Sequence, residues 1–119
     1  MDLDIGVWIH VGVRMRNLQT LVDNWIKNES ITKDYWKDPK SIFLRLVEEV
    51  GELSKEINKE YGEKHKKDSD LKTSIPDELS DVFFTTICLA NKLNIDLERE
   101  LMKTLGKYSK RKIIKEDLK

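Results

Sequence analysis

The sequence predicts an all-α protein, a bundle of four helices in a single domain. Apolar residues recur every three or four positions in four separate segments, which is the spacing of one face of an amphipathic helix. Two of these segments follow strong helix-start signals, Asp38-Pro39 and Ser74-Ile75-Pro76. A chain of 119 residues can bury one core but is short for two. No segment favours a sheet that could compete with the bundle.

The first two helices are predicted at residues 17–28 and 39–61. The apolar face of the first consists of Leu18, Leu21, Val22, Trp25 and Ile26. Asp38 can cap the free amides of the second helix, Pro39 fits its first position, and Gly62 follows its end. The apolar stripe of the second helix is Ile42, Leu46, Val50, Leu53 and Ile57.

The third helix is predicted to begin after Ser74, which can cap it, and to end near Asn94, a suitable left-handed terminator. Its expected buried face is Leu79, Val82, Phe83, Thr86, Ile87, Ala90 and Leu93. Asp96 can cap a fourth helix, whose apolar residues are Leu97, Leu101, Leu105 and Tyr108. Residues 62–74 are polar and rich in lysine, so they are predicted to form a mobile loop.

Composition limits the number of domains and the classes of partner that the chain can have. We expect residues 1–16 to form a leader of uncertain structure and residues 17–119 to form the single helical domain. Twenty-two basic residues balance twenty-two acidic ones, so no overall field favours nucleic acid or an anionic membrane. No apolar run approaches the roughly 20 residues of a membrane span. The lone Cys88 lies in an apolar stretch, which indicates a core thiol in a reducing cytoplasm.

Two carboxylate pairs carry the functional prediction. Glu49 and Glu52 lie three residues apart on the second helix, as do Glu78 and Asp81 on the third. Residues at this spacing are neighbours on a helix surface. Glu49 should border the core and Glu52 should stand just outside it. If the two helices pack antiparallel, all four carboxylates can converge on one pocket.

Oxygen-only ligands favour a hard divalent ion, Mg²⁺ or Mn²⁺. His10 and His65 are poorly placed to join such a site, and the Glu-x-x-His spacing of di-iron bundles is absent. The competing interpretation is ordinary ion pairing, in which Glu52 meets Lys55 and Glu48 meets Arg45. Gly51 between the acids destabilises a helix interior by about 1 kcal/mol, which close backbone packing near the site would explain.

These motifs resemble those of the MazG-like nucleoside triphosphate pyrophosphohydrolases. The segment Leu46-Val47-Glu48-Glu49-Val50-Gly51-Glu52-Leu53 matches the E-x-x-E motif of the family, and Asp77-Glu78-Leu79-Ser80-Asp81-Val82 matches its E-x-x-D motif. The likeness continues through residues 89–98 and reaches Lys107-Tyr108-Ser109-Lys110-Arg111. It spans residues 39–111.

The resemblance implies a MazG-like helical fold, completed by assembly into a homodimer or homotetramer. It implies Mg²⁺-dependent hydrolysis of a nucleoside triphosphate to a monophosphate and pyrophosphate. Glu49, Glu52, Glu78 and Asp81 would then hold the metal, and Lys107 and Arg111 would bind phosphates. Glu48 or Glu49 could accept the proton of the attacking water. A cationic helix end is the competing interpretation of the basic pair.

The sequence departs from the family at Leu105, where many members carry an asparagine before the lysine of the basic motif. Tyr35 or Trp36 could stack on the base, although core packing or interface burial is the favoured interpretation. The alternative function is a non-catalytic helical module that binds nucleotides or proteins. The missing asparagine favours it, and the four intact carboxylates argue against it.

Overall fold

The structure, a computed structural model, describes residues 14–29, 36–62 and 74–117, with side chains up to residue 112. These ranges contain four helices and no strand: α2 (Met15–Asn28), α3 (Pro39–Tyr61), α4 (Ile75–Lys92) and α5 (Leu97–Asp117). The all-α prediction is therefore confirmed, with α2 beginning two residues earlier than expected. His10, Tyr35, His65 and most of the predicted loop fall outside the described residues.

The predicted helix boundaries hold because their capping side chains make the expected bonds. The Ser41 amide donates to Asp38 Oδ1 at 2.8 Å, and the Asp77 amide donates to Ser74 Oγ at 3.3 Å. The Arg99 amide donates to Asp96 Oδ1 at 3.2 Å at the start of α5. Each bond satisfies an amide that has no partner inside its helix.

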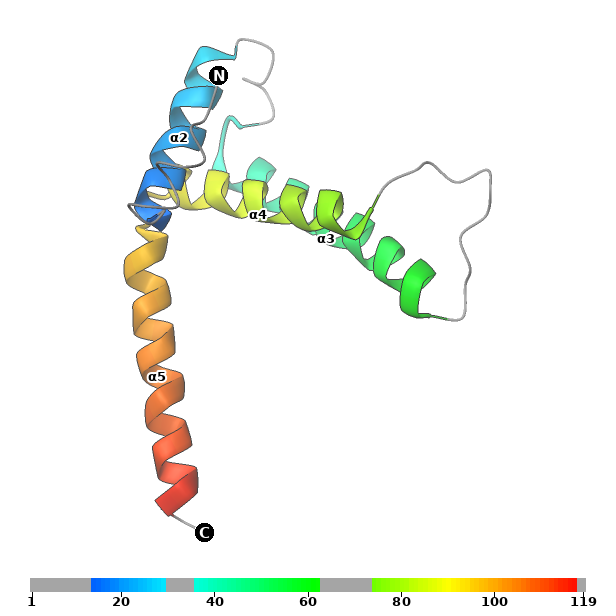
Figure 1. Ribbon diagram of the computed structural model, residues 1–119. Coiled ribbons are helices and arrows are strands. Elements are labelled where there is room, and N and C mark those ends of the chain that lie inside the picture. The colour runs from blue at the N-terminus through cyan, green and yellow to red at the C-terminus, as the bar shows by residue number, and fades with distance from the viewer. Residues whose placement is uncertain (1–13, 30–35, 63–73, 118–119) are drawn as a thin grey trace, which may run out of the picture.

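Helices α3 and α4 lie side by side and antiparallel, and α2 stands at one end of this pair (Figure 1). Among the described residues, the buried apolar ones are Ile42 of α3 and Ile87, Cys88 and Ala90 of α4. Trp25 of α2 and Trp36 both meet the ring of Phe84 edge-on, with ring centroids 5.9 and 5.5 Å apart. The core is therefore concentrated where α2 reaches the pair, and Trp36 contributes to it.

The predicted apolar stripes of α3 and α4 are buried only in part. Val50 and Ile57 of α3 are exposed, as are Leu79 and Phe83 of α4 and Leu93 directly after it. The positions turned inward include Glu49, Glu56, Glu78 and Thr85. The prediction of these apolar positions as buried was wrong because each helix carries apolar residues on two faces, and a single chain covers only one of them.

Helix α5 leaves the α3–α4 pair at a tight turn, contacts α2 and extends away from the rest of the chain (Figure 1). The turn uses Asn94 with a positive φ of 55°, as its predicted role as terminator requires. The Ile95 amide donates to the Ala90 carbonyl at 2.8 Å and closes the end of α4. None of the helices in the described ranges is long and apolar enough to cross a membrane.

Candidate metal centre

Three of the four predicted carboxylates come together between α3 and α4. Oxygen atoms of Glu49, Glu78 and Asp81 all lie within 4.8 Å of one another. Glu49 comes from the middle of α3, whereas Glu78 and Asp81 occupy the first two turns of α4. Because the helices are antiparallel, these segments meet side by side, as the sequence predicts.

The cluster combines burial with like charge. Glu49 and Glu78 are buried, whereas Asp81 is exposed. Burial raises the pKa of Glu78 above its ordinary value, and the nearby charges of Asp81, Glu49, Glu52 and Glu56 raise it further. A carboxylate in this position is stabilised by a cation.

Arg45 supplies part of that positive charge from one turn earlier on α3. Its Nε lies 3.0 Å from Glu49 Oε1, and its Nη1 lies 3.9 Å from Glu48 Oε2. The predicted Arg45–Glu48 pair is therefore present but long, and the closer partner is Glu49. The Glu48 side chain is 70% exposed, at the solvent edge of the cluster.

Glu52 lies outside the cluster in this structure. Its side chain is half exposed, and Lys55 Nζ lies 3.3 Å from its Oε1, the ion pair that the competing interpretation predicts. Its charge still contributes to the raised pKa of Glu78. Close packing does not explain Gly51, because a Cβ built there meets no atom within 4 Å.

Glu56 is an acidic residue near the cluster that the sequence interpretation missed. It is only 4% exposed, and Lys59 Nζ lies 3.5 Å from its Oε1. It follows Glu49 by seven residues, so both side chains share the inward face of α3 with Ile42. The seven-residue spacing from Glu49 was the signal available in the sequence.

The predicted phosphate-binding pair lies elsewhere in the chain. Lys107 and Arg111 are exposed on α5, which extends away from α3 and α4 (Figure 1). The Arg111 guanidinium lies over the Tyr108 ring, 5.7 Å from its centroid. The structure therefore gathers the acids within one chain but does not bring the basic pair to them.

The donor set suits a hard divalent cation. All three clustered side chains offer carboxylate oxygens, the ligands that Mg²⁺, Mn²⁺ and Ca²⁺ prefer. Two of the three are buried, and Arg45 is the cation that pairs with one of them, Glu49, within the described ranges, so negative charge exceeds positive charge there. A divalent ion would remove that imbalance.

Known proteins share both this sequence and this architecture. A sequence profile of the MazG nucleotide pyrophosphohydrolase domain matches residues 37–113. YpjD of Bacillus subtilis strain 168, itself an uncharacterized protein, is 38% identical over 97 residues, which cover 82% of this chain and 85% of YpjD.

Two solved structures are similar. One is that of B. subtilis YpjD, for which a pyrophosphatase activity has been proposed. It has a TM-score of 0.68 at 38% identity and covers 81% of this chain and 93% of its own. The other, a Bacillus-conserved MazG protein described as a nucleotide pyrophosphohydrolase, has a TM-score of 0.66 at 37% identity. That match covers 82% of this chain and 90% of its own. The chain therefore belongs to the MazG nucleotide pyrophosphohydrolase family.

Proposed function

We propose that this protein is a Mg²⁺-dependent hydrolase that converts a ribo- or deoxyribonucleoside triphosphate to the monophosphate and pyrophosphate. The observation that carries the proposal is the convergence of Glu49, Glu78 and Asp81 in a member of this family. A triphosphate is a natural substrate for such a site, because Mg²⁺ binds few carboxylates and completes its shell with water and phosphate oxygens. Mn²⁺ could replace Mg²⁺ at the same oxygens.

Four carboxylates would hold the metal. Glu49, Glu78 and Asp81 already face one another, and Glu52 lies on the adjacent turn of α3 with an exposed, rotatable side chain. For Glu52 to join them, its pair with Lys55 would have to break, which an exposed ion pair permits at little cost. When bound, Mg²⁺ would neutralise charge on the triphosphate and make a bound water more acidic.

Glu48 or Glu49 accepts the proton of the attacking water in this proposal. Glu48 is exposed at the edge of the cluster, and Glu49 lies inside it. If Glu48 is the base, Glu48→Gln should lower kcat by about a hundredfold and leave Mg²⁺ affinity unchanged. Glu49→Gln should lower both kcat and the affinity for Mg²⁺, because Glu49 also holds the metal.

In this proposal Lys107 and Arg111 bind the phosphates of the substrate, and assembly into a homo-oligomer brings them near the acidic cluster. In a single chain, α5 carries this basic pair away from the acidic cluster on α3 and α4 (Figure 1). The α5 helix of one copy would therefore have to approach α3 and α4 of another copy. Apolar residues Leu101, Met102 and Leu105 are exposed on the same helix and could be buried by that contact.

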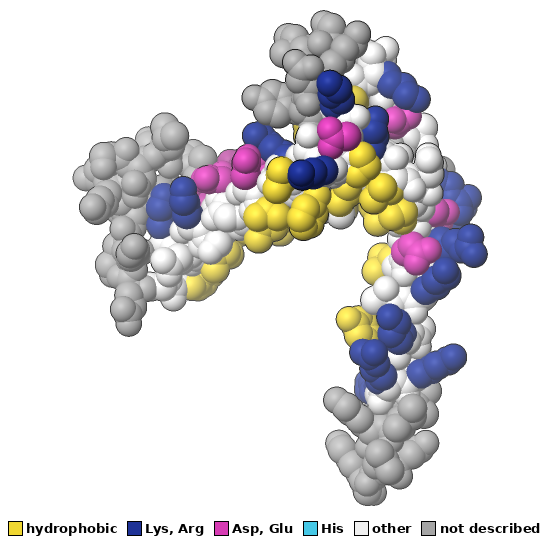
Figure 2. All heavy atoms as spheres, turned by 180° about the vertical axis from the view of Figure 1, so that it is seen from behind, with side chains coloured by type: hydrophobic (Ala, Val, Ile, Leu, Met, Phe, Trp, Pro, Cys, Tyr) yellow, Lys and Arg dark blue, Asp and Glu magenta, His cyan; other side chains and the backbone are white. Residues whose placement is uncertain are grey.

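The exposed apolar surface supports assembly into a homodimer or homotetramer. Phe43 and Val47 of α3 and Phe83 of α4 are each about half exposed. Figure 2 shows such side chains gathered along the α3–α4 pair. Contact with further copies of the chain would remove these side chains from water.

The deciding experiment measures products. Purified protein with Mg²⁺ is incubated with a panel of canonical and modified nucleoside triphosphates, and the products are separated by chromatography. At least one triphosphate should yield its monophosphate and pyrophosphate in equal amounts. Glu78→Gln should reduce kcat by at least about a hundredfold. Glu60→Gln, an exposed acid at the end of the same α3 helix, serves as the matched control and should keep full activity.

Two outcomes would contradict the proposal. Release of a diphosphate and inorganic phosphate would assign a different bond. Nucleotide binding by calorimetry without turnover on any substrate would assign the alternative function, a non-catalytic nucleotide-binding module on the same fold.

A further inference from the structure

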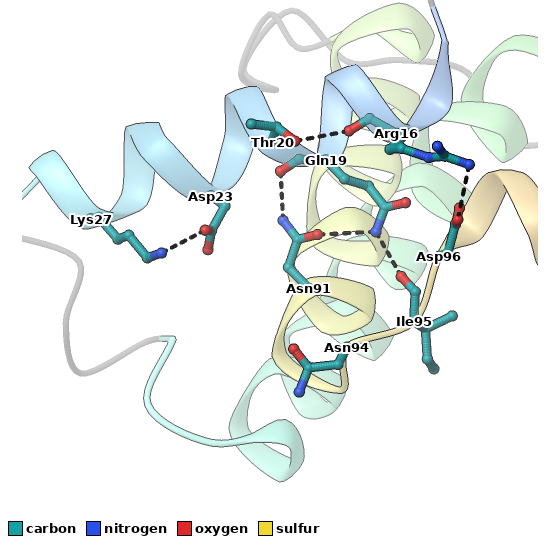
Figure 3. A pocket seen from close by; sticks show the side chains of 9 residues that line it. All are labelled: Arg16, Gln19, Thr20, Asp23, Lys27, Asn91, Asn94, Ile95 and Asp96. Carbon is teal, nitrogen blue, oxygen red and sulfur yellow. Dashed lines mark hydrogen bonds and ion pairs between the residues drawn. The ribbon is translucent and has the colours of Figure 1, made fainter.

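Gln19 is the buried residue of α2, with 8% of its surface exposed. It lies on the side of α2 that faces the turn between α4 and α5 (Figure 3). A buried amide requires hydrogen-bond partners, and each bond that it makes restrains the element that provides the partner.

The Gln19 amide joins three separate parts of the chain. Its Nε2 donates to Asn91 Oδ1 at 3.0 Å and to the Ile95 carbonyl at 2.8 Å. Its Oε1 accepts from the Leu97 amide at 2.9 Å. In return Asn91 Nδ2 donates to the Gln19 carbonyl at 2.9 Å. One side chain therefore bonds the last turn of α4, the connecting turn and the first residue of α5.

The bond to Leu97 is the most informative of these contacts. The first amides of a helix have no partner within it. Asp96 bonds the Arg99 amide, whereas the Leu97 amide is bonded by a side chain 78 residues away in the sequence. The start of α5 is thus fixed against α2 as well as against α4.

The surrounding cavity of about 460 Å³ does not itself indicate a ligand. Its charged side chains already have partners within its walls: Arg16 Nη2 lies 3.4 Å from Asp96 Oδ2, and Lys27 Nζ lies 2.8 Å from Asp23 Oδ2 (Figure 3). Gln19 points at backbone and amide partners of the turn. Its contacts are those of a link between helices.

We infer that Gln19 is a positioning residue that sets the direction of α5 and thereby the place of Lys107 and Arg111. This inference rests on the proposed function. At 1.5 Å per residue, Lys107 and Arg111 lie about 15 and 21 Å along α5 from Leu97. A tilt of about 10° at Leu97 would therefore move Arg111 by about 4 Å, a displacement comparable to the length of an ion pair.

The kinetic test compares Gln19→Met with Thr20→Ala. Methionine keeps the length of the side chain and removes its hydrogen bonds. Thr20 is the neighbouring residue of the same cavity, and its hydroxyl donates within α2 to the Arg16 carbonyl at 3.1 Å. Gln19→Met should raise KM for the triphosphate by about tenfold or more and change kcat less. The Mg²⁺ concentration for half-maximal activity should stay unchanged, and Thr20→Ala should match the wild type.

A double-mutant cycle separates positioning from general loss of stability. In a Lys107→Ala/Arg111→Ala background, Gln19→Met should raise KM little further, because the groups that it positions are gone. If Gln19→Met raises KM by the same factor in both backgrounds, or not at all, the inference is wrong. Gln19→Asn, which keeps the amide but shortens the side chain by one methylene, carries the same cycle if Gln19→Met does not fold.

Amide hydrogen exchange of Leu97, measured by NMR, tests the link without turnover. Exchange should be slow in the wild type and in Thr20→Ala, and fast in Gln19→Met, which lacks the amide oxygen that accepts from Leu97. Unchanged exchange in Gln19→Met would overturn the inference even in an active enzyme. A wild type that releases no pyrophosphate but shows this exchange pattern would refute the proposed function and leave the link between α2 and α5 standing.

Discussion

Glu78 is the residue at which burial and like charge act together. Its pKa is raised by burial first and then by the surrounding carboxylates. A folded-state pKa above the unfolded value means that stability falls as pH rises from the ordinary range of a glutamate through the raised pKa. In the absence of metal, this side chain should therefore destabilise the folded protein at neutral pH.

Glu78→Gln should consequently raise Tm at pH 7 in the presence of a chelator, because a neutral amide removes the buried charge. The same variant should lose the Mg²⁺-dependent rise in Tm, whereas the wild type at 100 times its Kd should gain about 2.7 kcal/mol. Differential scanning calorimetry with and without Mg²⁺ measures both effects. A lower Tm under both conditions would show that Glu78 is held by stabilising contacts instead.

Cys88, unlike Glu78, is a buried group that stays uncharged at neutral pH. It is buried, and burial raises the pKa of its thiol to about 12. The thiolate that reacts with alkylating reagents is therefore scarce at neutral pH.

Iodoacetamide at pH 7.5 should modify Cys88 at least about a hundredfold more slowly in the folded protein than in the protein unfolded by guanidinium. Mass spectrometry of timed samples gives the two rates. Comparable rates would place the thiol at an accessible surface and contradict its position in the core.

Helix α2, together with Arg14 directly before it, links α4 to α5. Besides the Gln19 bonds, Arg14 makes a two-pronged pair with Glu98 at the start of α5, with Nη2–Oε2 and Nε–Oε1 distances of 2.6 and 3.0 Å. The hydrogen bond from Arg14 lowers the pKa of Glu98, and the charge of Arg14 lowers it further. A carboxyl whose pKa is lowered in the folded state stabilises the protein at pH values above its unfolded-state pKa. This stabilisation is lost as pH falls through the folded-state pKa.

Glu98→Gln should therefore lower Tm by roughly 1–4 °C at pH 7 and make the loss of Tm below about pH 4.5 shallower than in the wild type. Thermal unfolding followed by circular dichroism between pH 3 and 7 tests this. Glu100→Gln, on the outer side of the same helix turn, is the control and should leave the acid limb unchanged. An equal change in the pH dependence of Tm in both variants would show that the Arg14–Glu98 pair is not its cause.

As a whole, the described helices leave much of their apolar surface exposed. One face of α3 and α4 carries both the acidic cluster and the small core, and apolar side chains on the other surfaces stay exposed. Burying them against further copies would lower the free energy of the protein in water.

Sedimentation equilibrium should accordingly give a mass of two or four chains at micromolar concentration. Phe83→Glu should weaken the assembly by at least about a hundredfold in Kd, because it puts a charge into an apolar interface. Lys92→Glu, also exposed on α4, is the matched control. A monomeric wild type, or identical masses for wild type and Phe83→Glu, would exclude this interface.

The sequence by itself determines most of the secondary structure and the inner residue of the first acidic pair, Glu49. Caps at Asp38, Ser74 and Asp96 and the left-handed Asn94 act within a few residues, so local chemistry is sufficient to locate them. Helical spacing also indicates that Glu49 lies nearer the core than Glu52, because it sets the angle between side chains on one helix.

Packing between distant segments settled the rest: Glu56 turns inward, Glu52 stays out with Lys55, and Gln19 bonds α4 and α5. Spacing along a helix does not specify how the helix is rotated about its axis or which of two apolar faces its neighbours cover. Those depend on contacts between residues far apart in the chain, so Val50 and Phe83, apolar and regularly spaced, remain at the surface.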